Sequence, residues 1–338
     1  MSHPFLEKEF HIRWSRLTPG LVKADIEAAL ARAEQKQAAV TGRPEEEATF
    51  ANTLLALEEA VEVLSDPWGK VGHLNSVCDS KPLREAYNAM LPAVSGFFTR
   101  ISLNPELWKR VKRVAEGEEA ARLDPVRKRF LEETVLDFRQ NGADLPADRK
   151  ERLEKLQEEL ATVTQRYSEN VLDSTNDWEL VIEDEAQLAG LPKHAKEAAR
   201  RSALAKGRGT EETPCWRFTL HMPSQEPFMT YLEDDGLRRR MWEGAVSIGG
   251  RGEWDNGPLV RRILELRREK AALLGKPHFA DFVLERRMAK DGKAALAFVD
   301  DLYARTQSHF ERECRKLEEF KAGETGAEAA PLEPWEIA

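Results

Sequence analysis

The chain has 338 residues, of which 41% are apolar and 33% are charged, and its formal net charge is −9. This length allows two or three domains with a substantial core, and the composition excludes a disordered chain. No run of about 18 apolar residues occurs, so we expect a soluble globular protein with no membrane partner. The net negative charge argues against nucleic acid as a partner, because phosphate binding relies on clustered Lys and Arg.

Most of the sequence has the periodicity of amphipathic helices. Between Leu153 and Val171, apolar residues recur every three or four positions, which predicts a long helix with one apolar stripe. Another helix is expected between Asp124 and Gly142, with Val126, Phe130 and Phe138 directed toward a core. Further helices are predicted over residues 19–40, 49–64, 256–275 and 293–321.

Only two short segments favour extended structure. Residues 178–183 and 216–221 are rich in aromatic and β-branched residues, so we expect them to pair as one small β-ribbon on a helical body. The predicted fold class is therefore mainly α, with multiple helices. The polar residues 322–326 are expected to be flexible, and the Pro-Trp-Glu-Ile run at 334–337 is expected to lead into a further packed element.

The histidines do not form a recognisable zinc motif. A HExxH helix needs two histidines four residues apart, and no two of the seven histidines have this spacing. His309 and Glu313 are the nearest alternative, and we interpret them as a solvated pair on a helix surface. We interpret His73 as a hydrogen-bonded histidine between packed helices rather than as a catalytic group.

Other catalytic patterns are also missing. The sequence has no GxSxG elbow, and its three cysteines are far apart and form no CxxC pair, which favours a reducing compartment. The glycine-rich residues 249–255 are interpreted as a surface loop between two helices, not as a dinucleotide site. The arginine runs at 238–240, 261–262 and 267–268 alternate with acidic residues and are interpreted as salt-bridged helix faces. We therefore predict no catalytic, cofactor-binding or metal-binding residue in this chain.

Several segments nevertheless match one family in order and spacing. The most specific is Asp-Pro-Trp-Gly-Lys-Val-Gly-His-Leu-Asn-Ser-Val at 66–77, followed by Arg-Glu-Ala-Tyr at 84–87. Later matches are Tyr-Ser-Glu-Asn at 167–170, Leu-Ala-Gly-Leu-Pro at 188–192, Trp-Asp-Asn at 254–256 and Pro-Trp-Glu-Ile-Ala at 334–338. Together they resemble the oligopeptidase A branch of the thimet oligopeptidase family, which consists of zinc-dependent peptidases.

This resemblance implies an almost wholly helical, two-lobed body around a deep channel that admits short peptides. It also implies that zinc is held by a HExxH helix and a downstream Glu in the C-terminal half of the family, which this chain does not match. We expect a helical segment at 1–143, a segment with the long helix and β-ribbon at 144–321, and a linker toward a catalytic domain at 322–338. The matching residues are expected to be helix caps, interhelical aromatics and loop glycines.

The leading hypothesis is that the chain is the N-terminal part of a cytoplasmic zinc oligopeptidase. It would wall the substrate channel, would bind no zinc and would be inactive alone. The cytoplasm is expected because the first ten residues lack the basic and apolar regions of a secretory signal. The alternative is a truncated, non-catalytic helical module that binds peptides or a partner. Under either hypothesis, exposed apolar surface would favour self-association.

Overall fold

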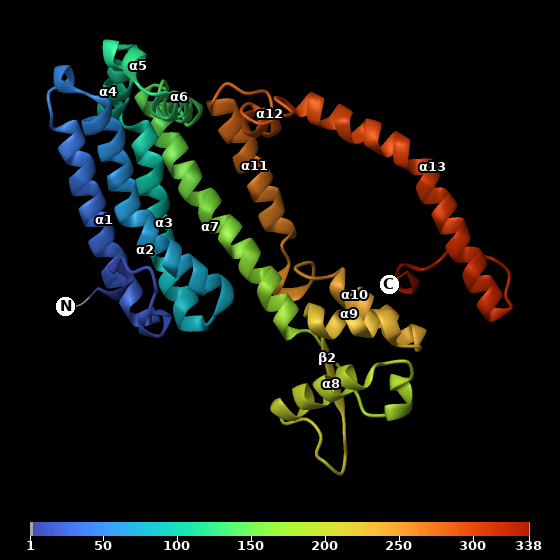
Figure 1. Ribbon diagram of the computed structural model, residues 1–338. Helices are drawn as coiled ribbons and strands as arrows, with labels where there is room; N and C mark the ends of the chain where they lie inside the picture. Colours follow the sequence, from blue (N-terminus) through green and yellow to red (C-terminus); the bar gives the residue numbers. More distant parts are fainter. Residues whose placement is uncertain (1–2, 338) are drawn as a thin grey trace. The chain divides into compact units, whose positions relative to one another are not determined.

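The computed structural model describes residues 3–337, and this part of the chain is mainly α, as predicted. It contains thirteen α-helices and one two-stranded sheet (Figure 1). The chain divides into two compact units, one formed by residues 1–163 and 263–286 and the other by residues 164–262 and 287–338. The expected segments at 1–143, 144–321 and 322–338 stay a prediction. Within the described residues, every helix is too short or too polar to span a lipid bilayer.

The first unit is a bundle in which α1 packs against both α2 and α3 (Figure 1). Its complete helices are α1 Pro19–Thr41, α2 Ala56–Val77, α3 Lys81–Leu103, α4 Pro105–Glu116, α5 Glu118–Arg122, α6 Pro125–Gln140 and α12 Phe279–Leu284. Parts of α7 Ala147–Asp177 and α11 Gly257–Leu273 also belong to it. The helix expected from residue 49 begins with a π-helical segment, Phe50–Leu55, and α2 continues it. The other short helices are 3₁₀ turns at Pro4–Leu6, Trp14–Arg16, Glu45–Glu47, Glu185–Leu188, Gly252–Trp254 and Pro334–Glu336.

One apolar core fills the bundle. Its fully buried large side chains include Phe5, Ile26, Leu54, Leu64, Phe97 and Leu107. On α6, Phe138 is buried and stacks on Trp108, with ring centroids 5.7 Å apart. The prediction for Val126 is wrong: it is 79% exposed. It lies in the first turn of α6, where the Asp124 side chain accepts from its N–H and the valine side chain faces water.

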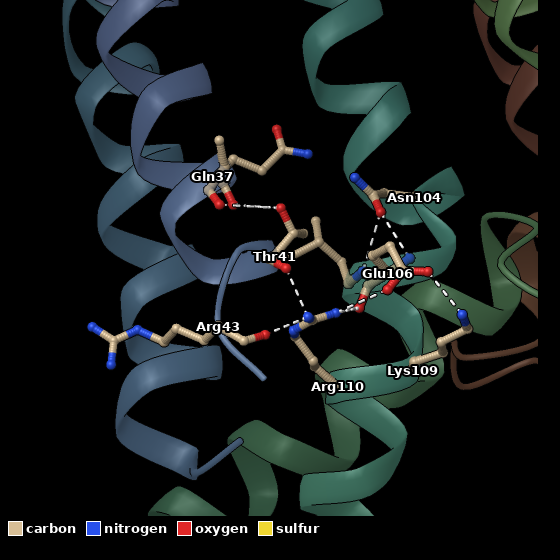
Figure 2. A network of polar contacts seen from close by, with 9 residues as sticks. Gln37, Thr41, Arg43, Asn104, Glu106, Lys109 and Arg110 are labelled. Carbon is tan, nitrogen blue, oxygen red and sulfur yellow. Dashed lines mark hydrogen bonds and ion pairs between the residues drawn. The ribbon is translucent and has the colours of Figure 1, made fainter. Parts of the chain in front are cut away.

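A buried arginine fixes the start of α4 to the end of α1 (Figure 2). Asn104 caps α4 by accepting hydrogen bonds from two backbone N–H groups of its first turn. One turn later, Arg110 donates to the backbone oxygens of Thr41 at 2.6 Å and Arg43 at 2.5 Å. The Thr41 carbonyl belongs to the last turn of α1 and the Arg43 carbonyl lies just beyond it, so neither has a partner within the helix. Nothing in the local sequence pattern marks Arg110, because the carbonyls of Thr41 and Arg43 come from a distant segment.

The second unit contains the sheet. Strands β1 Glu179–Ile182 and β2 Trp216–Thr219 pair antiparallel, with Leu180 opposite Phe218, so the predicted ribbon is confirmed. Leu180, Ile182, Trp216 and Phe218 are buried against a second core. That core includes residues of α8 Lys193–Ala205, α9 Met222–Tyr231 and α10 Asp235–Ala245.

In the last helix, α13, none of the described side chains is buried. It spans Gly292–Thr325, with Asp291 as its N-cap, and ends at Gly326 in the left-handed conformation. The prediction that residues 322–326 are flexible is therefore wrong for 322–325, which continue the helix. A 3₁₀ turn at Pro334–Glu336 follows, and its Trp335 packs against Trp242 of α10.

Candidate functional site

The residues of the 66–77 motif hold the first unit together. Lys70 is buried, and its Nζ donates to the backbone oxygens of Phe5 at 3.0 Å and Glu7 at 2.8 Å, and to Asp66 at 2.9 Å. Trp68 stacks on Tyr87, with ring centroids 4.6 Å apart. This part of the motif therefore anchors the N-terminal segment and pairs α2 with α3.

His73 does not lie where we predicted. It is exposed, and its ring lies against the Trp14 ring, with centroids 4.9 Å apart, instead of between packed helices. It lies on an exposed side of α2 beside the short turn Trp14–Arg16, so the apolar neighbours in the sequence gave a misleading picture of its surroundings.

The sequence predicts no metal ligand in this chain, and that stays a prediction. Within residues 3–337, no three His, Cys, Asp or Glu side chains converge in a way that could hold a metal. His309 and Glu313 are exposed on α13, and His309 Nδ1 lies 2.6 Å from Nη2 of Arg312. A cationic neighbour is unfavourable for a metal ligand. The three cysteines, Cys78, Cys215 and Cys314, have free thiols.

The glycine-rich segment is a loop between α10 and α11, as predicted. Helix α10 comes directly before it, so the described residues here lack the strand-loop-helix arrangement of a dinucleotide site. Gly249 has φ +64°, and its N–H donates to Ser174 Oγ of α7 at 2.9 Å. A Cβ there would lie 2.8 Å from Nδ2 of Asn256, so this position requires glycine.

This loop forms one wall of an open cavity of about 550 Å³ in the second unit. The end of α7, the start of β1, α10 and the loop supply its lining. Trp178 and Trp254 contribute aromatic surface. Trp178 packs directly on Gly244, where a Cβ would lie 2.5 Å from Cε2 of the indole. Gly244 therefore lets the indole lie close against α10, which fixes its position in the wall.

Several charged side chains of this cavity are already neutralised. Glu179 forms ion pairs with Arg208 and, at 2.6 Å, with Arg217. The hydrogen bond from Arg217, together with the charge of Arg208, lowers the pKa of Glu179 below its ordinary value of 4.5. Glu243 pairs with Arg239 at 2.9 Å.

Two arginines of the same lining have no such partner. Within residues 3–337, the guanidinium groups of Arg240 and Arg251 have no carboxylate within 4.0 Å. The predicted salt-bridged face thus holds for Arg238, which pairs with Asp235 at 3.1 Å, and for Arg239, but not for Arg240. The sequence could not distinguish them, because all three lie in one run.

The cavity of the first unit has a different character. It measures about 670 Å³ and lies between residues 45–49, α4 and the start of α5. Its charged lining comprises Glu45, Glu46, Lys109, Lys112, Arg113, Glu116, Glu118 and Glu119. No aromatic side chain lines it, and Glu119 accepts a hydrogen bond from the N–H of Phe50. It therefore offers fewer apolar contacts to an organic ligand than the cavity beside Trp178.

In a comparison with known proteins, two family models match successive parts of the chain. The model of peptidase family M3 matches residues 228–338, and that of the neurolysin/thimet oligopeptidase N-terminal domain matches residues 22–150. The chain is therefore similar to peptidase family M3 in its C-terminal part and to the thimet oligopeptidase N-terminal domain in its N-terminal part. It is similar to oligopeptidase A of Salmonella typhimurium, with 34% identity over 345 residues that cover the whole chain and 49% of that protein.

Two relatives from Arabidopsis thaliana extend this similarity. A probable cytosolic oligopeptidase A is 29% identical over 94% of the chain and 45% of its own length. A chloroplastic and mitochondrial oligopeptidase A is 28% identical over 95% of the chain and 40% of its own length. The chain thus spans about half the length of the curated relatives it matches, and the resemblance inferred from the sequence motifs is confirmed.

Proposed function

We propose that this chain is the N-terminal part of a cytoplasmic, zinc-dependent oligopeptidase that hydrolyses short peptides. In this proposal it walls the substrate channel and supplies no zinc ligand. The main support is that an N-terminal-domain model and the M3 model match successive parts of a chain spanning about half of each oligopeptidase A relative. The name of one Arabidopsis relative supports a cytosolic location, while that of the other shows that similar proteins also occur in organelles.

The exposed face of α13 also supports this proposal. Eight large apolar side chains on this helix are each between 45% and 68% exposed: Leu296, Phe298, Val299, Leu302, Tyr303, Phe310, Leu317 and Phe320. Exposure of so much apolar surface is unfavourable in water. A catalytic part of the protein that packs on α13 would cover this surface.

The test compares the 338-residue chain with a chimaera that joins it to the remaining half of Salmonella oligopeptidase A. We expect the chimaera to cleave a quenched fluorescent peptide in a chelator-sensitive reaction. We expect the chain alone to bind no stoichiometric zinc by elemental analysis and to cleave no peptide. Chelator-sensitive cleavage by the chain alone would contradict the proposal that the zinc ligands lie elsewhere.

The second candidate is a non-catalytic helical module that binds peptides or a partner. The same exposed face of α13 favours it, because such a face can recruit another protein. The chimaera separates the two candidates: a folded but inactive chimaera would favour the module, whereas an active chimaera would favour the peptidase.

A further inference from the structure

We infer that the cavity lined by Trp178, Trp254, Arg240 and Arg251 is a binding site for the carboxylate end of a short peptide. The choice of a peptide as the ligand rests on the proposed function. The cavity itself is defined by residues of the second unit alone. The site would hold peptides without taking part in their hydrolysis.

The charges of the cavity decide the chemical class of the ligand. Glu179 and Glu243 are neutralised by arginines outside the lining, namely Arg208, Arg217 and Arg239. The lining then retains the two guanidinium groups of Arg240 and Arg251, balanced by the carboxylates of Asp177 and Glu253. Such a lining is nearly neutral in total but carries both signs, which suits a ligand with a single carboxylate better than a polyanion.

The guanidinium groups are the recognition elements for a carboxylate. A guanidinium can donate two parallel hydrogen bonds to a carboxylate, and such charge-assisted bonds are stronger than neutral ones. Arg240 comes from α10 and Arg251 from the following loop, and both are exposed, so their side chains are free to reach a ligand. The acidic Asp177 and Glu253 would accept hydrogen bonds from peptide N–H groups or basic side chains.

The two tryptophans add apolar contact. Indole rings in a cavity wall bind apolar and aromatic side chains with little loss of conformational freedom. Trp178 is held in place because Gly244 allows it to lie against α10. Ser174, which also lines the cavity, fixes the loop by accepting from the N–H of Gly249. The volume of about 550 Å³ suits a few residues of peptide, not a folded partner.

The test measures binding to the 338-residue chain with two probes. One is an N-acetylated tetrapeptide that ends in Phe with a free carboxylate, and the other is the same peptide with a C-terminal amide. We expect calorimetry and tryptophan fluorescence to show saturable binding of the peptide acid. The peptide amide should bind at least about tenfold more weakly. Inorganic phosphate should not displace the peptide. Equal binding of acid and amide, or no saturable binding, would overturn the site.

Variants then locate the binding. Arg240→Gln combined with Arg251→Gln should remove the preference for the acid, and both positions are exposed, so the fold should be retained by circular dichroism. Arg201→Gln is the matched control, because Arg201 is an exposed arginine of α8 outside the cavity. If the Arg201 variant loses the preference for the peptide acid to the same extent, or if the double variant keeps that preference, the proposed binding site is contradicted. Binding is measured without hydrolysis, so an active chimaera with no acid preference would refute this site and leave the proposed peptidase function standing.

Discussion

Asn170 Nδ2 donates a 2.9 Å hydrogen bond to Oδ1 of Asn256, and both side chains are buried. Asn256 in turn donates from Nδ2 to the backbone oxygen of Tyr167 at 3.1 Å. These residues come from two motifs 86 positions apart, Tyr-Ser-Glu-Asn and Trp-Asp-Asn. The motifs thus meet in space to join α7 to the residue that precedes α11, which supports a structural reason for their presence.

This pair predicts a measurable coupling. Asn170→Ala or Asn256→Ala alone should lower the free energy of unfolding by about 1 to 3 kcal/mol, because each leaves a buried polar partner unsatisfied. The double variant should cost less than the sum, with a coupling of about 0.5 to 3 kcal/mol in a double-mutant cycle by urea unfolding. Asn176→Ala, at an exposed position of α7, is the control. Strictly additive losses would show that the bond contributes nothing.

The close approach of Trp178 to Gly244 gives the second prediction. Gly244→Ala should lower stability by about 1 to 3 kcal/mol and change the near-UV circular dichroism, because the new methyl group would displace a rigid indole. Gly72→Ala is the matched control, since no atom lies within 4 Å of a Cβ at that helical position. This control should gain about 0.5 to 1 kcal/mol from higher helix propensity. A neutral Gly244 variant would contradict the packing described here.

Much of the fold was predictable because helix signals are local. Caps such as Asp124, the apolar periodicity of α7 and the β-branched and aromatic residues of β1 and β2 each depend on residues close in sequence. His73, Val126 and Arg240 could not be placed in this way, because their surroundings come from distant segments. The cavity beside Trp178 has the same origin: α7, α10 and the loop must meet before it exists.

The buried Lys270 makes stability depend on pH. It is 9% exposed, and burial lowers its pKa from 10.5 to about 8, although Nζ donates to Gln157 at 2.8 Å and lies 4.8 Å from the Phe282 ring. The folded state thus disfavours the charged form. The free-energy cost of burying the charged Lys270 side chain is fully present below pH 8 and disappears as the pH rises from about 8 to 10.5. This residue therefore makes the protein more stable at higher pH.

Lys270→Met should therefore stabilise the protein at pH 7, by up to about 3 kcal/mol at 1.36 kcal/mol per pKa unit. Urea unfolding at several pH values should show that the difference between variant and wild type shrinks from pH 8 to 10.5. Lys316→Met, at an exposed position of α13, controls for the loss of one positive charge. A constant difference across this pH range would show that Lys270 is not titrating.

The spacing of the apolar residues on α13 predicts how the isolated chain behaves in solution. Leu296, Val299, Tyr303, Phe310 and Leu317 follow one another at steps of 3, 4, 7 and 7, which places them on one stripe of the helix. All are at least 45% exposed. We expect the chain to bind an apolar dye and to self-associate with increasing concentration, because association removes this stripe from water.

Phe310→Glu combined with Leu317→Glu should reduce both dye fluorescence and the average mass in analytical ultracentrifugation. Helix content should not change, because neither side chain is buried in the unit. Val126→Glu is the matched control: it removes an apolar side chain that is 79% exposed on α6, away from the stripe, and should leave association unchanged. If the chain is monomeric at all concentrations and does not bind the dye, the stripe must be covered within the chain itself. The argument for a partner surface on α13 would then fail.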